Sequence, residues 1–201
     1  ITLTDNGGSG TEVDFGTLAD VVDDYQTNFK NTVTFKFQAG DTIDIDNSTE
    51  LGKFVTDIGT SALTLTDQAV TVSGTTLSVT QARSIAADTT GTVTGSIDTA
   101  TRVSDLTTLY NPGGGNETNA WTVVISSADK TGSTAANLNT INSATSVAVD
   151  LTEVTALAAS DISDLTELNA NKNGLSNRGN LASITLTDNG GSGTEVDFGT
   201  L

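Results

Sequence analysis

The sequence predicts an α/β protein that is built as a repeat solenoid, a stack of short parallel strands and short helices. Two observations predict this fold: the chain contains a long exact duplication, and a short strand pattern followed by a short helical pattern recurs every ~25 to 37 residues. Composition agrees, because 35% of the residues are hydrophobic and only 4% are aromatic. Such a chain is suited to thin, regular layers rather than to a bulky core.

The duplication sets the domain organisation. Residues 1–18 read ITLTDNGGSGTEVDFGTL, and residues 184–201 read the same at every position. The copies start 183 residues apart, so we interpret residues 1–183 as one full period and residues 184–201 as the start of the next identical period. Perfect identity, loop positions included, indicates recent duplication or homogenisation. Tandem arrays are typical of fibres, stalks and surface coats, and we expect no enzyme.

We expect about six strand–helix units in each period. Their strands are predicted at residues 1–5, 33–37, 63–67, 93–97, 121–125 and 147–151, and residues 184–188 open the next period. The helical patterns follow at residues 18–25, 51–58, 79–86, 103–109, 135–141 and 162–168. Further extended pieces at 42–46 and 69–72 are candidates for a second strand in some units.

Each predicted helix has only two or three turns, so its stability must come from packing against the strands. Start signals support two of these helices: the Ser78/Gln81 and Thr17/Asp20 spacings both resemble capping boxes. Successive strands are expected to stack as one parallel sheet at ~4.8 Å per strand, so that six units advance roughly 29 Å. The positions expected to face inward include Ile1, Leu3, Leu63, Leu65, Val147 and Val149.

The alternative fold is a tandem pair of all-β immunoglobulin-like sandwiches, for which a period of 183 residues has room. Frequent Gly, Thr and Val favour it. The repeated Leu-x-x-Leu spacings, at Leu106/Leu109 and Leu165/Leu168, favour the helices of the solenoid instead.

Charge and missing residue types restrict the function. The chain carries 25 acidic and 8 basic residues, a net charge of -17, which repels nucleic acid. It has no Cys and no His, which removes thiolate chemistry, imidazole bases and Cys-ligated metals. No apolar run approaches the ~20 residues of a membrane span. We expect neither nucleic-acid binding nor membrane insertion.

The acidic residues are candidates for binding calcium, which takes six to eight oxygen ligands. The best group is Asp41, Asp44 and Asp46, in the sequence GDTIDID, where Asp44 and Asp46 share a strand face opposite the isoleucines. Other acids end the predicted strands: Asp5, Asp67, Asp98, Asp150 and Asp188. The alternative is that the acids form only a solvated surface that keeps the protein soluble.

Two stretches carry a resemblance to a known class of protein. Residues 78–99 (SVTQARSIAADTTGTVTGSIDT) and 146–171 (SVAVDLTEVTALAASDISDLTELNAN) resemble repeats of very large secreted surface proteins of cyanobacteria and other Gram-negative bacteria, the RTX or hemolysin-type adhesins. The string DNGGSGTEVDFG resembles a degenerate RTX nonapeptide without the strict GGxGxD spacing. The resemblance implies export by a type I-like route, residence outside the cell and a mechanical or adhesive role.

We therefore expect a structural repeat of an extracellular fibre, sheath or surface layer that elongates by stacking identical periods. Its expected partner is itself, head to tail, with lateral association as a further option and calcium as the candidate cofactor. One alternative is an adhesin stalk that projects a distal binding domain. Another is an ice- or glycan-binding surface made from the threonine rows on the outward strand positions, such as Thr64 and Thr66.

Overall fold

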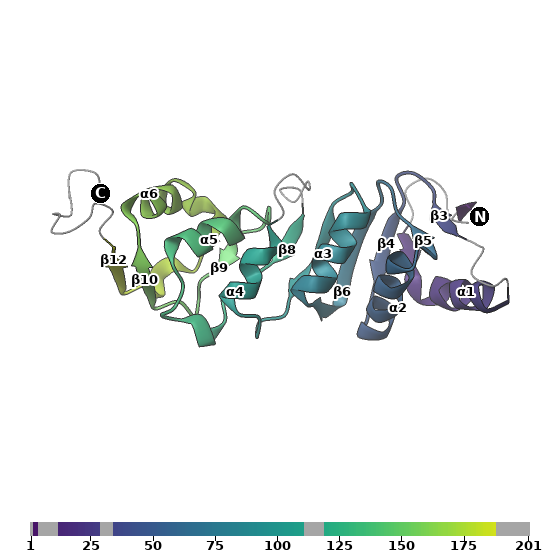
Figure 1. Ribbon diagram of the computed structural model, residues 1–201, viewed down its shortest axis with the longest axis horizontal. Helices are drawn as coiled ribbons and strands as arrows, with labels where there is room; N and C mark the ends of the chain where they lie inside the picture. Colours follow the sequence, from purple (N-terminus) through teal and green to yellow (C-terminus); the bar gives the residue numbers. More distant parts are fainter. Residues whose placement is uncertain (1, 4–11, 29–33, 111–118, 188–201) are drawn as a thin grey trace.

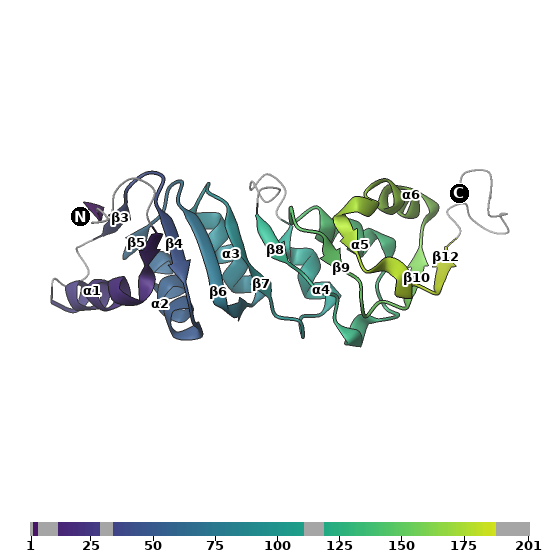
Figure 2. The same ribbon diagram turned by 180° about the vertical axis from the view of Figure 1, so that it is seen from behind.

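The computed structural model describes residues 2–3, 12–28, 34–110 and 119–187. The molecule is elongated, and its elements follow one another along the long axis in chain order (Figure 1). The first and last elements therefore lie at opposite ends, and the view from behind gives the same order (Figure 2). Each strand–helix segment thus contacts mainly its neighbours in sequence.

All six predicted helical patterns are confirmed. The helices are α1 (Phe15–Asn28), α2 (Ser48–Gly59), α3 (Val79–Asp88), α4 (Val103–Leu106), α5 (Ala135–Asn142) and α6 (Ile162–Ala170). Short 3-10 turns follow at η1 (Thr107–Leu109), η3 (Ser127–Asp129), η4 (Lys172–Gly174) and η5 (Arg178–Asn180). Within the described ranges, no helix has the length and apolar character needed to cross a bilayer.

One predicted capping box is confirmed and the other is wrong. Ser78 caps α3: its hydroxyl accepts the N–H of Gln81, whose side chain returns to the Ser78 N–H. Thr17 does not start a helix, because α1 already begins at Phe15. The helix runs straight out of the strand before it, so that Thr17 lies inside the first turn.

The strands pair in parallel throughout the described residues. Their bounds are β1 (Thr2–Leu3), β2 (Glu12–Asp14), β3 (Phe35–Phe37), β4 (Thr42–Ile45), β5 (Leu63–Thr64), β6 (Ala69–Leu77), β7 (Val93–Ile97), β8 (Ala120–Thr122), β9 (Val149–Asp150), β10 (Ala156–Ser160), β11 (Leu175–Ser176) and β12 (Ser183–Leu186). Four small sheets result, with the orders β1-β3-β5, β2-β4-β6-β7-β8, β11-β9 and β10-β12. This is a mixed α/β protein, so the all-β sandwich, whose strands are antiparallel, is wrong.

The expectation of one continuous sheet is also wrong. The extra extended pieces predicted at 42–46 and 69–72 are confirmed as β4 and β6, and they form the largest sheet together with β2, β7 and β8. The predicted strand 93–97 therefore pairs with β6 rather than continuing from β5. Parallel neighbours within a sheet still come from successive segments of the chain, as the pairs Thr42–Ala69 and Thr94–Ala120 illustrate.

The core is one continuous layer of buried apolar side chains between the helices and the strands. Ile43 and Ile45 are fully buried on β4, and they alternate with the half-buried Thr42 and Asp44, as the period-2 pattern predicts. Leu63, Leu65 and Val149 are buried as predicted. Val147 was expected to face inward and is 37% exposed, because β9 begins only at Val149.

Candidate functional site

The features that stand out are the contacts between successive strand–helix units, which we call joints. Two joints use the same hydroxyl motif. Thr89 Oγ1 donates to the Gln68 carbonyl at 2.6 Å, and Thr145 Oγ1 donates to the Trp121 carbonyl at 2.7 Å. Each hydroxyl also accepts the N–H two residues further along the chain, at 2.9 and 3.1 Å. Both threonines are 8% exposed, so each links its own turn to the preceding unit in a buried place.

The first N–H groups of two helices donate hydrogen bonds to side chains of the following unit. The N–H of Val103, the first residue of α4, donates to Asp129 Oδ2 at 2.9 Å. The N–H of Ala135, the first residue of α5, donates to Ser160 Oγ at 2.9 Å. The N–H groups of a first helical turn have no partner within the helix, so the next unit satisfies these donors. The sequence analysis missed this role of Asp129 and Ser160, since nothing local signals a cap 25 or 26 residues away.

The start of the second sequence copy makes the same kind of joint. Strand β12 pairs in parallel with β10, through Leu157 opposite Ile184. Thr187 Oγ1 donates to Oδ1 of Asp161, the N-cap residue of α6, at 2.6 Å. Thr187 belongs to the duplicated segment. The boundary between periods is thus built like a joint inside the period.

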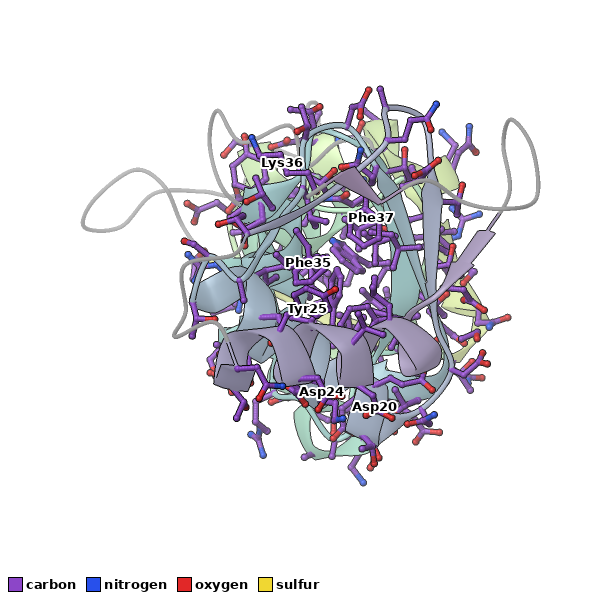
Figure 3. The ribbon with its side chains drawn as sticks, turned by 90° about the vertical axis from the view of Figure 1, so that its right-hand side faces the viewer. Asp20, Asp24, Tyr25, Phe35, Lys36 and Phe37 are labelled. Carbon is purple, nitrogen blue, oxygen red and sulfur yellow. The ribbon has the colours of Figure 1, made fainter. Side chains whose placement is uncertain are left out.

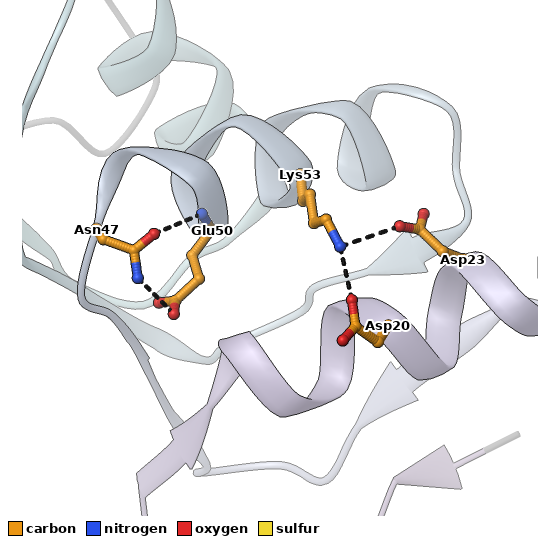
Figure 4. Close-up of polar contacts among 5 residues, drawn as sticks. All are labelled: Asp20, Asp23, Asn47, Glu50 and Lys53. Atoms are coloured by element: carbon orange, nitrogen blue, oxygen red, sulfur yellow. Dashed lines mark hydrogen bonds and ion pairs between the residues drawn. The ribbon is translucent and has the colours of Figure 1, made fainter.

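The contact between α1 and α2, which we call the first joint, is polar at its surface (Figure 4). Lys53 of α2 contacts Asp20 at 2.7 Å and Asp23 at 3.3 Å, both on α1. Hydrogen bonds to these two carboxylates raise the pKa of Lys53. Asn47 caps α2 by accepting the N–H groups of Thr49 and Glu50, each at 3.0 Å. The two ion pairs of Lys53 fix the flank of α1 that faces α2.

We expect Asp129→Ala to destabilise the protein by about 2 to 3 kcal/mol. Asp129 is 8% exposed, holds the Val103 N–H and contacts Arg102 Nη2 at 2.9 Å. Its removal leaves a buried N–H and a guanidinium without their acceptor. Urea unfolding measures the effect, and Asp105→Ala, at an exposed position of α4, is the control. Equal losses in the two variants would contradict the role of Asp129.

A second buried acid lies near the first joint. Asp57 of α2 is 5% exposed, and its Oδ2 accepts no hydrogen bond from any described residue. Burial, followed by the charge of Asp23, raises the pKa of Asp57 from its ordinary value of 3.8 to about 6. The folded state therefore favours the protonated acid.

The raised pKa of Asp57 predicts a dependence of stability on pH. Since its folded-state pKa lies above the unfolded value, ionisation of Asp57 costs stability, which falls as the pH rises from about 4 through about 6. We expect Asp57→Asn to stabilise the protein by on the order of 1 to 2 kcal/mol at pH 8 and to have no such effect below pH ~4. Urea midpoints across this range measure it, with Asp105→Asn as control. A stabilisation independent of pH would contradict the assignment.

The predicted calcium group is spread along β4, with Asp41 just before the strand and Asp46 just after it. Asp41 is 8% exposed and accepts the Gln38 N–H at 3.0 Å, whereas Asp46 is exposed and accepts the Ser73 hydroxyl at 3.2 Å. Asp44 lies between them, half-buried on the outward face. Over the described ranges, no three acidic, His or Cys side chains are placed to hold a metal ion. Calcium binding at these residues stays a prediction.

Some strand-end acids have structural partners. Asp98 Oδ1 accepts the Ala100 N–H at 2.9 Å, and Asp150 Oδ1 accepts the Thr152 N–H at 2.8 Å, so both form turns. Burial opposes ionisation of Asp150, but hydrogen bonds from Asn177 and Thr152 outweigh it and lower the pKa. Ile1, Thr4, Asp5, Asp188 and the glycine-rich turn 6–10 lie outside the described residues.

The two ends of the molecule differ from its middle. At the C-terminal end, an apolar hollow of about 430 Å³ opens beside α6 and β12. It is lined by Leu138, Leu151, Leu157, Leu165, Leu168, Asn169, Lys172, Leu175, Arg178, Leu181, Ile184 and Leu186. At the N-terminal end, Val21 and Tyr25 of α1 are 41% and 38% exposed. Figure 3 shows Tyr25 at this end, next to Phe35. Sequence analysis pointed to these ends only through the duplication.

No protein-family model, curated protein or solved structure matches this chain. Its function is therefore argued from the joints and the ends.

Proposed function

We propose that this chain is a structural repeat of an extracellular fibre, sheath or surface layer, built as a continuous α/β solenoid. One observation carries the proposal. Strand β1 and the end of β12 have the same sequence, Thr2–Leu3 and Thr185–Leu186, and they occur at opposite ends of the molecule. Strand β1 pairs with the strand after it, β3, whereas β12 pairs with the strand before it, β10. In an array, one strand would make both pairings.

Because the last strand of one period has the sequence of the first strand of the next, the array can grow without a fixed stop. Each period ends on a strand that is the first strand of the next, so every added period presents the same unfinished end. Stability in such arrays is roughly a sum of unit and nearest-neighbour terms. The inter-unit hydrogen bonds of the described residues fit this rule, since they join residues 21 to 33 positions apart.

Charge and composition support a place outside the cell. The net charge of -17 keeps neighbouring filaments apart in the absence of a bridging cation, and calcium, which is millimolar outside cells, is the cation we propose for lateral contacts. The resemblance of residues 78–99 and 146–171 to secreted bacterial surface repeats supports the same location.

Electron microscopy of chains with one, two and three periods tests the proposal. Strands advance ~4.8 Å and packed helices ~8 to 10 Å per unit, so six units should add roughly 30 to 60 Å. We expect smooth rods with a constant increment in that range, which associate laterally when calcium is added. Beaded rods, or increments above roughly 70 Å, would overturn the solenoid. Rods that stay single at every calcium and protein concentration would favour the adhesin stalk instead.

A further inference from the structure

We propose that the apolar hollow at the C-terminal end is the binding site for helix α1 of a second copy of this chain. This inference rests on the proposed function, and it adds which surfaces meet and by which chemistry. It implies that separate chains, and not only consecutive periods of one chain, join head to tail.

The hollow has an apolar floor and a basic rim. Leu165 and Leu168 of α6 contribute to the floor, and Ile184 of β12 is 46% exposed at its edge. Lys172 and Arg178, two of the eight basic residues of the chain, also line it, and both are exposed. A partner for this surface needs apolar side chains next to acidic ones.

Helix α1 has that combination among its exposed residues. The flank that carries Asp20 and Asp23 faces α2, where Lys53 binds both carboxylates. At ~100° per residue, Val21 and Tyr25 point away from that flank, and Asp24 lies between Asp20 and Val21 around the helix. All three are exposed, and the end-on view shows Asp24 beside Asp20 on one side of α1 and Tyr25 on the other side, toward Phe35 (Figure 3). Tyr25 is steadied by Phe35, with ring centroids 5.6 Å apart at 88°.

The order of the helices along the chain indicates that α1 of the second copy packs against α6, beside the hollow. Within the chain, α1 packs on α2, α2 on α3 and α5 on α6. In the described structure α6 has a preceding helix but no following one. The sequence that follows β12 repeats the sequence that leads into α1, so α1 is the helix that belongs after α6.

The strands allow the same contact between two chains. The place beside β10 is already filled by β12, which carries the sequence of the incoming β1. The incoming β3 lies between its own β1 and β5, so it pairs with the resident β12, through Lys36 and Phe37, only when that β12 takes the place of the incoming β1. The contact is therefore heterologous: the two partners use different surfaces, and chains can add indefinitely.

Two charge reversals on the full chain test the polarity. Lys172→Glu/Arg178→Glu disables the C-terminal end, and Asp24→Lys disables the N-terminal end, each at exposed positions. In sedimentation velocity, we expect the unmodified chain to form dimers and longer species with rising concentration, and each variant alone to associate about tenfold more weakly. Mixed in equal amounts, the variants should again form dimers and longer species, because each supplies one intact end and the two reversed ends carry complementary charges.

Arg83→Glu and Asp105→Lys, at exposed positions on α3 and α4, are the matched controls and should assemble like the unmodified chain. Circular dichroism checks that all variants stay folded. The inference is overturned if the unmodified chain stays monomeric up to millimolar concentration, or if the mixture associates no better than either variant alone. Constant length increments in electron microscopy would leave the proposed function standing in any of these cases.

Discussion

Gly74→Ala should destabilise the protein by more than about 3 kcal/mol, enough to unfold much of the chain. Gly74 lies in β6, where the pairing register with β7 shifts between Thr71 and Thr76. A Cβ at this position would overlap the backbone carbonyl of Asp46 in the neighbouring unit. Backbone cannot give way as a flexible side chain can, so the two units must move apart.

Gly52→Ala is the matched control for this substitution. Gly52 lies in the middle of α2, and a Cβ there would meet nothing within 4 Å. The exchange should therefore stabilise the helix by roughly 0.5 to 1 kcal/mol. Urea unfolding followed by fluorescence of Trp121, the single tryptophan, measures both variants. A Gly74→Ala midpoint close to that of the unmodified protein would contradict the close approach.

Phe54→Ala should destabilise the protein by about 3 to 5 kcal/mol. Phe54 of α2 and Phe15 of α1 are both fully buried, and their rings meet edge to face at 4.9 Å and 82°. The substitution removes this contact and leaves a cavity between the first two units. The loss is both the transfer free energy of the ring and the cost of the cavity.

Phe54→Leu keeps most of the volume, so we expect it to cost only about 1 to 2 kcal/mol. Hydrogen exchange adds a second readout, because nearest-neighbour coupling predicts that protection falls most in α1 and α2. Uniform loss of protection up to α6 would instead mean that the whole chain unfolds as one unit.

The helices could be predicted because their signals are local. Apolar residues at helical spacing, such as Leu165 and Leu168, mark the side that must be buried. The capping box at Ser78 is likewise contained within four residues. Ser73 and Thr89, by contrast, give no sequence sign that they bind the units before them.

The candidate site was predictable only in part. The duplication indicated that identical periods meet, and the structure places its Ile184 next to Leu157 of β10. That Lys172 and Arg178 surround an apolar hollow does not follow from their separation in sequence. The group Asp41, Asp44 and Asp46 was chosen from spacing alone, and its side chains have different partners and exposure.

The sequence by itself determined the repeat, the acidic surface, the six helices and most strand positions, because each depends on residue type and on spacing within a few residues. Only the tertiary structure decided how strands divide into four sheets, which side chains cap a helix of the preceding unit, and where the core stays open. Those features join residues more than 20 positions apart. Their energy depends on how the chain turns between units, which no local pattern encodes.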